Sequence, residues 1–404
     1  MTNYSLFFTE TELKHIYLEI SPDAQAQAWR RNQRFSTPSR RWNAYLNQLC
    51  LDAFLNWLRQ AYPQATSWMN PAHYSSVWEM VDGSAIVLQS RSENPIRLVL
   101  IQNAAIDLSE LRVPQEWVDI PSWAGDYYLA AQVEPDDGWI RIWGFTTHAR
   151  LKNGTYDATD RTYSLDAEAL ITDLDVLWEA QQRCPNEVTQ AVLAPLPALP
   201  LPQVENLITR LGNPEVILPR LEIPFAMWGA LIEHSGWRQR VYHQRLGITE
   251  SWSVSQWLRS GVSELAQQLG WQRDEFQPGL VGARGAEATE APGSLLSRQL
   301  TIANQPYELR VIPQVAPDRF QGSVWRFELR RSVSEGATPE EQQIPRGVKL
   351  RLLTEDLQPF ENNEATALRA VNHLYVIVAL APGEGLVWEI EPTPENYERE
   401  ILRF

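Results

Sequence analysis

Alternation of apolar and polar residues over seven short runs in the last quarter of the chain is the feature that most constrains the fold. A period of two is typical of strands that bury one face, and turn residues separate the runs. Several short strands with no helix between them predict a β-sandwich over residues 295–404. The runs are 296–302, 307–312, 324–331, 349–353, 374–380, 386–390 and 397–404.

The last of these runs ends the sequence on apolar residues rather than on a polar tail. Its final residues are Ile401, Leu402, Arg403 and Phe404. In a strand, Leu402 and Phe404 lie on one face, because successive side chains point to opposite sides. We therefore expect 397–404 to be a strand whose Leu402 and Phe404 side chains are buried in the core of the sandwich.

Residues 1–183 show the helical period first and the strand period afterwards. Apolar residues at helical spacing mark 41–62 as the clearest helix, with Pro38 before it and Pro63 at its end. Cys50 lies beside this apolar stripe and is expected to be a small core residue.

Two pairs of strand-like runs follow the first helix. They are 84–90 with 96–102 and 127–133 with 139–144, and turn residues join the members of each pair. A closing helix with Ser164 as its cap is expected to extend through Trp178. Residues 1–183 are therefore predicted to be one α+β domain with a mostly antiparallel sheet.

The remainder of the chain divides by composition. Residues 184–271 are predicted to be a Pro-rich connector followed by a helical segment, and 272–294, rich in Gly and Pro, a linker. The prolines at 195–202 also allow a polyproline ligand, although a stiff connector is favoured. The predicted fold class is thus α+β, with an N-terminal α+β domain, a helical middle and a C-terminal all-β sandwich.

Charge and cysteine content restrict the location and the partners. The net charge is −15 at pH 7, so nucleic acid would meet long-range repulsion. No apolar run is long enough to span a membrane and no leader peptide opens the sequence. The two cysteines, Cys50 and Cys184, cannot form a disulfide framework. We expect a cytoplasmic protein that binds neither nucleic acid nor membranes.

Catalytic and metal-binding motifs are missing from the sequence. The six histidines lack the spacing of a zinc site, and no nucleophile elbow is present. A dyad of Cys184 with His148 or His234 stays open, because such partners converge only in the fold. We predict no metal, no cofactor and no catalytic residue, and a non-enzyme is favoured over an enzyme.

Two features suggest surfaces for binding another protein. Trp139, Arg141 and Trp143 share one face of a predicted strand, which is either packed under a helix or exposed to a partner. Arg30, Arg31, Arg34, Arg40 and Arg41 form a basic run before the first helix, either as a solvated face or as a grip for an acidic partner. Most of the 17 tryptophans are expected to fill core edges.

Three stretches carry a resemblance to a known family. They are RWNAYLNQLCLDAF at 41–54, WRQRVYHQR at 237–245 with SQWL at 255–258, and PGEGLVWEI at 382–390 with EILRF at 400–404. Together they resemble the cyanobacterial family of unknown function DUF1822 over nearly the whole chain. The resemblance implies no reaction and no cofactor, because these motifs hold Trp, Arg, Leu and Gly rather than catalytic groups. It also implies an accessory component encoded near signalling or protease-like proteins.

The leading hypothesis is a non-enzymatic protein-interaction or regulatory module of a bacterial signalling assembly, with another protein as its partner. The alternatives are an enzyme with an inter-domain active site and a carbohydrate-binding sandwich. Convergent titratable residues with perturbed pKa values would favour the enzyme. An exposed, Trp-rich apolar patch would favour the interaction module.

Overall fold

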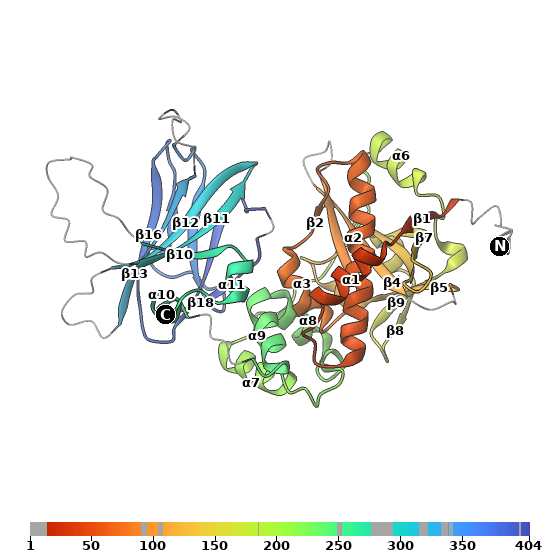
Figure 1. Cartoon of the computed structure of the whole chain (residues 1–404), viewed down its shortest axis with the longest axis horizontal. Coiled ribbons are helices and arrows are strands. Elements are labelled where there is room, and N and C mark those ends of the chain that lie inside the picture. The colour runs from red at the N-terminus through yellow and green to blue at the C-terminus, as the bar shows by residue number, and fades with distance from the viewer. Residues whose placement is uncertain are drawn as a thin grey trace. The chain divides into compact units, whose positions relative to one another are not determined.

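The computed structural model folds into two compact units, Met1–Ile248 and Thr249–Phe404 (Figure 1). Both contain helices and strands, so the fold is mixed as predicted, and the sheets of the second unit are antiparallel. The structure describes residues 14–89, 95–103, 108–184, 186–248, 253–275, 294–314, 322–332, 338, 342–395 and 397–404.

The larger sheet of the N-terminal unit has the strand order β1-β7-β6-β4-β3-β2. All its pairings are antiparallel except β4 with β6, and both predicted strand pairs are present. The strands are β1 (Ile16–Glu19), β2 (Thr66–Ser67), β3 (Ser84–Leu88), β4 (Ile96–Asn103), β6 (Tyr127–Glu134) and β7 (Trp139–Thr147).

The predicted first helix is α2 (Pro38–Ala61), which packs against β1, β2, β3, β4 and β6. The Thr37 hydroxyl caps it by accepting from the Arg40 backbone N–H at 3.2 Å, and Pro38 occupies its first turn, where no N–H is needed. Cys50 is buried in this interface as expected, and burial raises the pKa of its thiol to about 12. A shorter helix, α1 (Pro22–Arg31), precedes α2.

The predicted closing helix from Ser164 to Trp178 is wrong. Ser164 lies in β9 (Thr162–Asp166), between β5 (Glu110–Pro114) and β8 (Thr155–Asp157) in a small antiparallel sheet. The helix there is α6 (Asp175–Arg183). The local apolar spacing suggested a helix, but residues 162–166 pair with β5, about fifty residues earlier, and with the neighbouring β8, and apolar spacing does not report such pairing.

The helices that follow belong to the N-terminal unit. Residue Leu199 of the Pro-rich connector is buried, and Leu196 lies next to Gly229. The sequence predicted a separate connector and helical segment at 184–271. In the structure, residues 184–248 belong to the same compact unit as residues 1–183. The remaining helices of this unit are α3 (Tyr74–Trp78), α4 (Gln115–Asp119), α5 (His148–Lys152), α7 (Leu201–Leu211), α8 (Phe225–Glu233) and α9 (Ser235–Arg245), with 3-10 turns η2 (Pro71–His73), η3 (Ala167–Ala169) and η4 (Pro219–Leu221).

Two antiparallel sheets make up most of the C-terminal unit, in the orders β10-β11-β12-β13-β16 and β15-β14-β17-β18. Strands occupy all seven predicted runs, although the last is shorter than expected. The strands are β10 (Trp271–Glu275), β11 (Ser294–Ile302), β12 (Gln305–Gln314), β13 (Ser323–Arg331), β14 (Lys349–Thr354), β15 (Glu364–Thr366), β16 (His373–Leu380), β17 (Gly385–Glu391) and β18 (Ile401–Arg403).

The segment before these sheets differs from the predictions in two details. Ser253 caps a helix as expected, but a turn at Gly261, with φ +96°, divides that helix into α10 (Val254–Ser260) and α11 (Glu264–Gln268). The predicted linker 272–294 overlaps β10, which pairs with β11. Residues 276–293 of that linker lie outside the described residues.

The chain end links the two sheets of the C-terminal unit. Leu402 is fully buried and Phe404 is 7% exposed, as the sequence predicts. The Phe404 ring lies 4.9 Å from Trp325 and 5.9 Å from Phe327, both on β13 of the other sheet. The last residues therefore fill the space between the sheets.

Replacing Leu402 with alanine should destabilise the C-terminal unit by about 2–5 kcal/mol, because the residue is fully buried and leaves a cavity. Leu368→Ala is the matched control, since Leu368 is 81% exposed, and it should change stability by less than about 0.5 kcal/mol. Urea unfolding of the full chain measures both. Equal effects of the two substitutions would show that the chain end does not contribute to the core.

Candidate functional site

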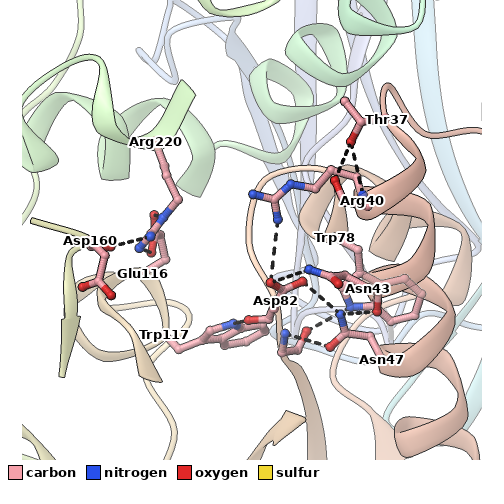
Figure 2. Close-up of polar contacts among 12 residues, drawn as sticks. Thr37, Arg40, Asn43, Asn47, Trp78, Asp82, Glu116, Trp117, Asp160 and Arg220 are labelled. Carbon is pink, nitrogen blue, oxygen red and sulfur yellow. Dashed lines mark hydrogen bonds and ion pairs between the residues drawn. The ribbon is translucent and has the colours of Figure 1, made fainter. Parts of the chain in front are cut away.

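Asp82 is the centre of a polar cluster in the N-terminal unit (Figure 2). Arg40, Asn43 and Asn47 reach it from the first turns of α2, where their spacing places them on one side of the helix. Asn43 Nδ2 donates to Asp82 Oδ2 at 3.1 Å, and Asn47 Nδ2 donates to Oδ1 at 3.4 Å. Arg40 Nη1 lies 3.8 Å from Oδ2. Both carboxylate oxygens therefore face donors from a single helix.

The backbone of the Asp82–Gly83 turn is fixed by side chains from three elements. Asn47 Oδ1 accepts from the Gly83 N–H at 2.8 Å, and Trp78 Nε1 donates to the Gly83 carbonyl at 2.9 Å. Trp117 Nε1 donates to the Asp82 carbonyl at 2.8 Å. Gly83 has φ +118°, and a Cβ there would lie 2.5 Å from Trp117 Nε1. The turn thus requires glycine.

The environment of the Asp82 carboxyl is compatible with two roles, one in acid–base chemistry and one in holding the turn. Its side chain is 32% exposed, and desolvation raises the pKa of its carboxyl, although Arg40, Asn43 and Asn47 act in the opposite direction. A partly exposed carboxyl with a raised pKa is suited to general acid–base chemistry. A carboxylate that accepts two side-chain hydrogen bonds is equally suited to fixing a turn.

Beside this cluster, the carboxylate of Glu116 on α4 pairs with Arg220 of η4. Arg220 Nε and Nη2 donate to its two oxygens at 2.9 and 2.7 Å, and Trp228 Nε1 donates to Oε1 at 2.8 Å. Glu116 is fully buried. Arg220 also donates to the Asp160 carbonyl at 2.6 Å. The two charges are therefore compensated by a bidentate contact that joins α4 to the later helices.

A second buried pair connects Glu79 with Arg245 of α9. Arg245 Nε donates to Glu79 Oε1 at 2.7 Å, and the Ser36 N–H donates to Oε2 at 3.0 Å. Both charged side chains are at most 1% exposed. The pair joins α9 to the end of α3 and to the segment just before α2.

A different kind of surface lies where α1 meets α2. Trp29 and Trp42 are 39% and 42% exposed, and they are the tryptophans with more than a third of their surface exposed among the residues that the structure describes. Their ring centroids are 6.5 Å apart, and Tyr45 contacts both at 5.4 and 5.3 Å. The Arg41 guanidinium lies 3.8 Å from the Trp29 ring centroid, a cation–π contact.

Three arginines lie next to these tryptophans in the sequence. Arg30 and Arg31 are exposed in the last turn of α1, and Arg31 lies 3.7 Å from Asp52. Arg41 is held in place by donating to the Asn32 carbonyl at 3.1 Å and to Gln33 Oε1 at 2.7 Å. We call Trp29, Arg30, Arg31, Arg41 and Trp42 the aromatic–arginine patch.

The strand face singled out in the sequence lies elsewhere in the same unit, on β7. Trp143 is 6% exposed, whereas Trp139 and Arg141 are half-buried. Tyr17 of β1 contacts the Trp139 ring at 5.9 Å, and Arg141 Nε donates to His15 Nδ1 at 2.9 Å. Side chains of residues 15 and 17 therefore contact part of this face.

Trp42 belongs to the apolar residues at helical spacing that predict the helix at 41–62, and that spacing predicts burial for it, whereas Trp29 lies outside this pattern. Local periodicity cannot show that Trp42 is exposed, since exposure depends on which elements pack against that part of the helix. The neighbouring run of arginines was the available signal, and one of its members, Arg41, stacks on the exposed Trp29 ring.

Cys184 and His148, which the sequence left open as a catalytic dyad, differ in their surroundings. Cys50 is buried and Cys184 exposed, and both are free thiols. His148 is buried, with Nδ1 accepting from the Ala191 N–H at 3.0 Å and Nε2 lying 2.8 Å from the Val118 carbonyl. Within the described ranges, no group of three potential metal ligands occurs, and no helix is long and apolar enough to cross a membrane.

Comparison with known proteins identifies the family. The family model for a protein of unknown function, DUF1822, matches residues 18–403. The chain belongs to this family. No curated protein and no solved structure matches it. The predicted resemblance is thus confirmed at the level of the family, and DUF1822 membership supplies no activity, so the function has to be argued from the site.

The Asp82–Gly83 turn gives a steric prediction. Gly83→Ala should destabilise the N-terminal unit by about 1–3 kcal/mol more than Gly247→Ala, because the new Cβ collides with Trp117. Gly247 is the matched control, since it also has positive φ (+64°), but no atom lies within 4 Å of the place that a Cβ would occupy. Urea unfolding of the two variants compares them, and equal losses would contradict the packing described for this turn.

The raised pKa of Asp82 gives a pH prediction. The folded state retains the Asp82 proton to a higher pH than the unfolded chain, in which the pKa is about 4. The stability contributed by this group is therefore present at low pH and is lost as the pH rises above about 4. We expect the unfolding free energy of the natural protein, relative to Asp82→Asn, to decrease between about pH 4 and pH 7. A difference that stays constant or increases would show that the pKa is not raised.

Proposed function

We propose that this protein is a non-enzymatic interaction or regulatory module of a bacterial signalling assembly, and that the aromatic–arginine patch is its docking surface. The observation that carries the proposal is the pair of neighbouring exposed tryptophans with an arginine stacked on one of them. Exposed aromatic clusters are uncommon on proteins that bind nothing there.

The composition of the patch matches that of energetic centres in protein–protein interfaces. Tryptophan and arginine are enriched at such centres, because each buries a large area and still offers hydrogen-bond donors. Trp29 and Trp42 both retain about 40% of their surface for a partner. A partner that covers these rings would gain from the burial of apolar surface.

The patch is also held rigidly before any partner arrives. Helix α2 is packed across the sheet, and its capped first turn carries Arg41 and Trp42. Two hydrogen bonds hold the Arg41 side chain over Trp29. Binding would therefore lose little side-chain entropy, which favours affinity.

The signalling context and the β-sandwich fold of the C-terminal unit are supported by different observations. The signalling context rests on the resemblance to DUF1822 proteins described above. A β-sandwich for the C-terminal unit is supported by its two antiparallel sheets and by the contacts of Phe404 with Trp325 and Phe327 between them.

An enzymatic function is the second candidate, and the partly exposed Asp82 carboxyl with its raised pKa is the observation that favours it. The carbohydrate-binding alternative needs several coplanar exposed rings. In the C-terminal unit, Tyr375 is the large aromatic residue that is exposed within the described ranges. The interaction module is therefore preferred.

Affinity capture from source cells tests the proposal. The full chain and a Trp29→Ala/Trp42→Ala variant serve as baits, and mass spectrometry quantifies the retained proteins. We expect at least one partner to be retained by the natural chain and to decrease about tenfold or more with the variant, because loss of interface tryptophans typically costs over 1.4 kcal/mol.

Tyr375→Ala is the matched control for this capture, since Tyr375 is 47% exposed and belongs to the other unit. It should retain the same partner at the level of the natural chain. A set of captured proteins that is identical for all three baits would contradict a docking role for the patch.

A further inference from the structure

We infer that the aromatic–arginine patch recognises an acidic segment of a partner protein, in which carboxylates flank an apolar side chain. This inference rests on the proposed function and specifies its partner. The apolar side chain would cover Trp29 and Trp42, and the carboxylates would meet the arginines of the patch.

Charge complementarity is the first argument. The chain as a whole carries a net charge of −15, yet Arg30 and Arg31 follow Trp29 in the last turn of α1, and Arg41 of α2 stacks on the Trp29 ring. Asp52 compensates Arg31 at 3.7 Å. Arg30 and Arg41 therefore provide most of the positive charge available to a ligand.

The geometry of Arg41 is the second argument. Its hydrogen bonds to Asn32 and Gln33 use two of the five guanidinium N–H groups, so others can meet a carboxylate. Stacking on Trp29 fixes the plane of the guanidinium. A planar, oriented guanidinium is well suited to a bidentate contact with a carboxylate.

The overall charge selects among anionic partners. A nucleic acid or an anionic membrane presents many charges over a large area, and a chain with a net charge of −15 repels both at long range. A short acidic segment carries few charges and needs only the local patch. The apolar surface of Trp29 and Trp42 also matches a peptide side chain.

Acidic groups near the patch limit where the carboxylates of a bound ligand can lie. Asp136 lies close enough to Tyr45 to contribute to the raised pKa of that phenol, after the larger effect of burial. The acidic groups Asp52 and Asp136 thus border the patch, and they disfavour a ligand that is uniformly acidic along its length. An acidic segment with an apolar centre satisfies both conditions.

Fluorescence anisotropy of the full chain with labelled synthetic peptides tests the inference. The probe is a peptide in which glutamates flank a central Phe-Leu pair, and its control has glutamine at every glutamate position. We expect the glutamate peptide to bind about tenfold or more tightly than the glutamine peptide, and to bind more weakly as salt is added.

Two variants and two matched controls locate the binding site. Trp42→Ala should weaken binding of the glutamate peptide about tenfold or more, and Arg30→Glu should weaken it several-fold at low salt, about the effect of a rim charge. Tyr375→Ala and Arg183→Glu, at exposed positions that are not part of the patch, should leave binding unchanged. Circular dichroism confirms that each variant is folded.

Several results would overturn the inference. These are equal binding of the two peptides, no binding of either, or binding that neither patch variant weakens. Tighter, Trp42-dependent binding of a single-stranded oligonucleotide or of phosphatidylserine vesicles would also overturn it. If capture from cells still depends on Trp29 and Trp42 in any of these cases, the proposed function stands and only the acidic partner is wrong.

Discussion

Two buried carboxylate–arginine pairs are the interactions on which the N-terminal unit depends. The Glu79–Arg245 pair joins α9 to the end of α3, and the Glu116–Arg220 pair joins η4 to α4. Removing one partner of such a pair leaves an uncompensated buried charge, at a cost of about 3–5 kcal/mol. A domain is stable by only about 5–15 kcal/mol, so the loss of one partner would remove a large part of the stability of this unit.

The same contacts hold the surface that we propose for docking. Ser36 donates to the Glu79 carboxylate just before α2 begins, so the start of α2 is fixed from one side by this pair. The Asp82 cluster fixes it from another side through Arg40 and Asn43. Arg41 and Trp42 follow directly in the sequence. The aromatic–arginine patch is therefore exposed on a segment whose neighbours are tied to the core.

The sequence predicted those parts of the fold that depend on local periodicity. The helix at 41–62, both strand pairs and the seven C-terminal runs were recovered because their apolar patterns are local. Residues 164–166 were assigned to a helix, whereas they pair with β5, about fifty residues earlier, and with the nearby β8, and apolar spacing did not reveal either pairing. Pairing of Glu79 with Arg245 spans 166 residues and leaves no local pattern. The exposure of Trp42 depends on tertiary packing, so the candidate site was only indicated by its arginines.

A double-mutant cycle on the Glu79–Arg245 pair tests most directly whether buried pairs unite the N-terminal unit. Glu79→Gln, Arg245→Met and the double variant are compared with the natural chain by urea unfolding. We expect each single substitution to cost about 3–5 kcal/mol and the double variant to cost less than the two combined, with a coupling energy on the order of 2 kcal/mol or more. Single effects that add to the double effect within about 0.5 kcal/mol would contradict this account.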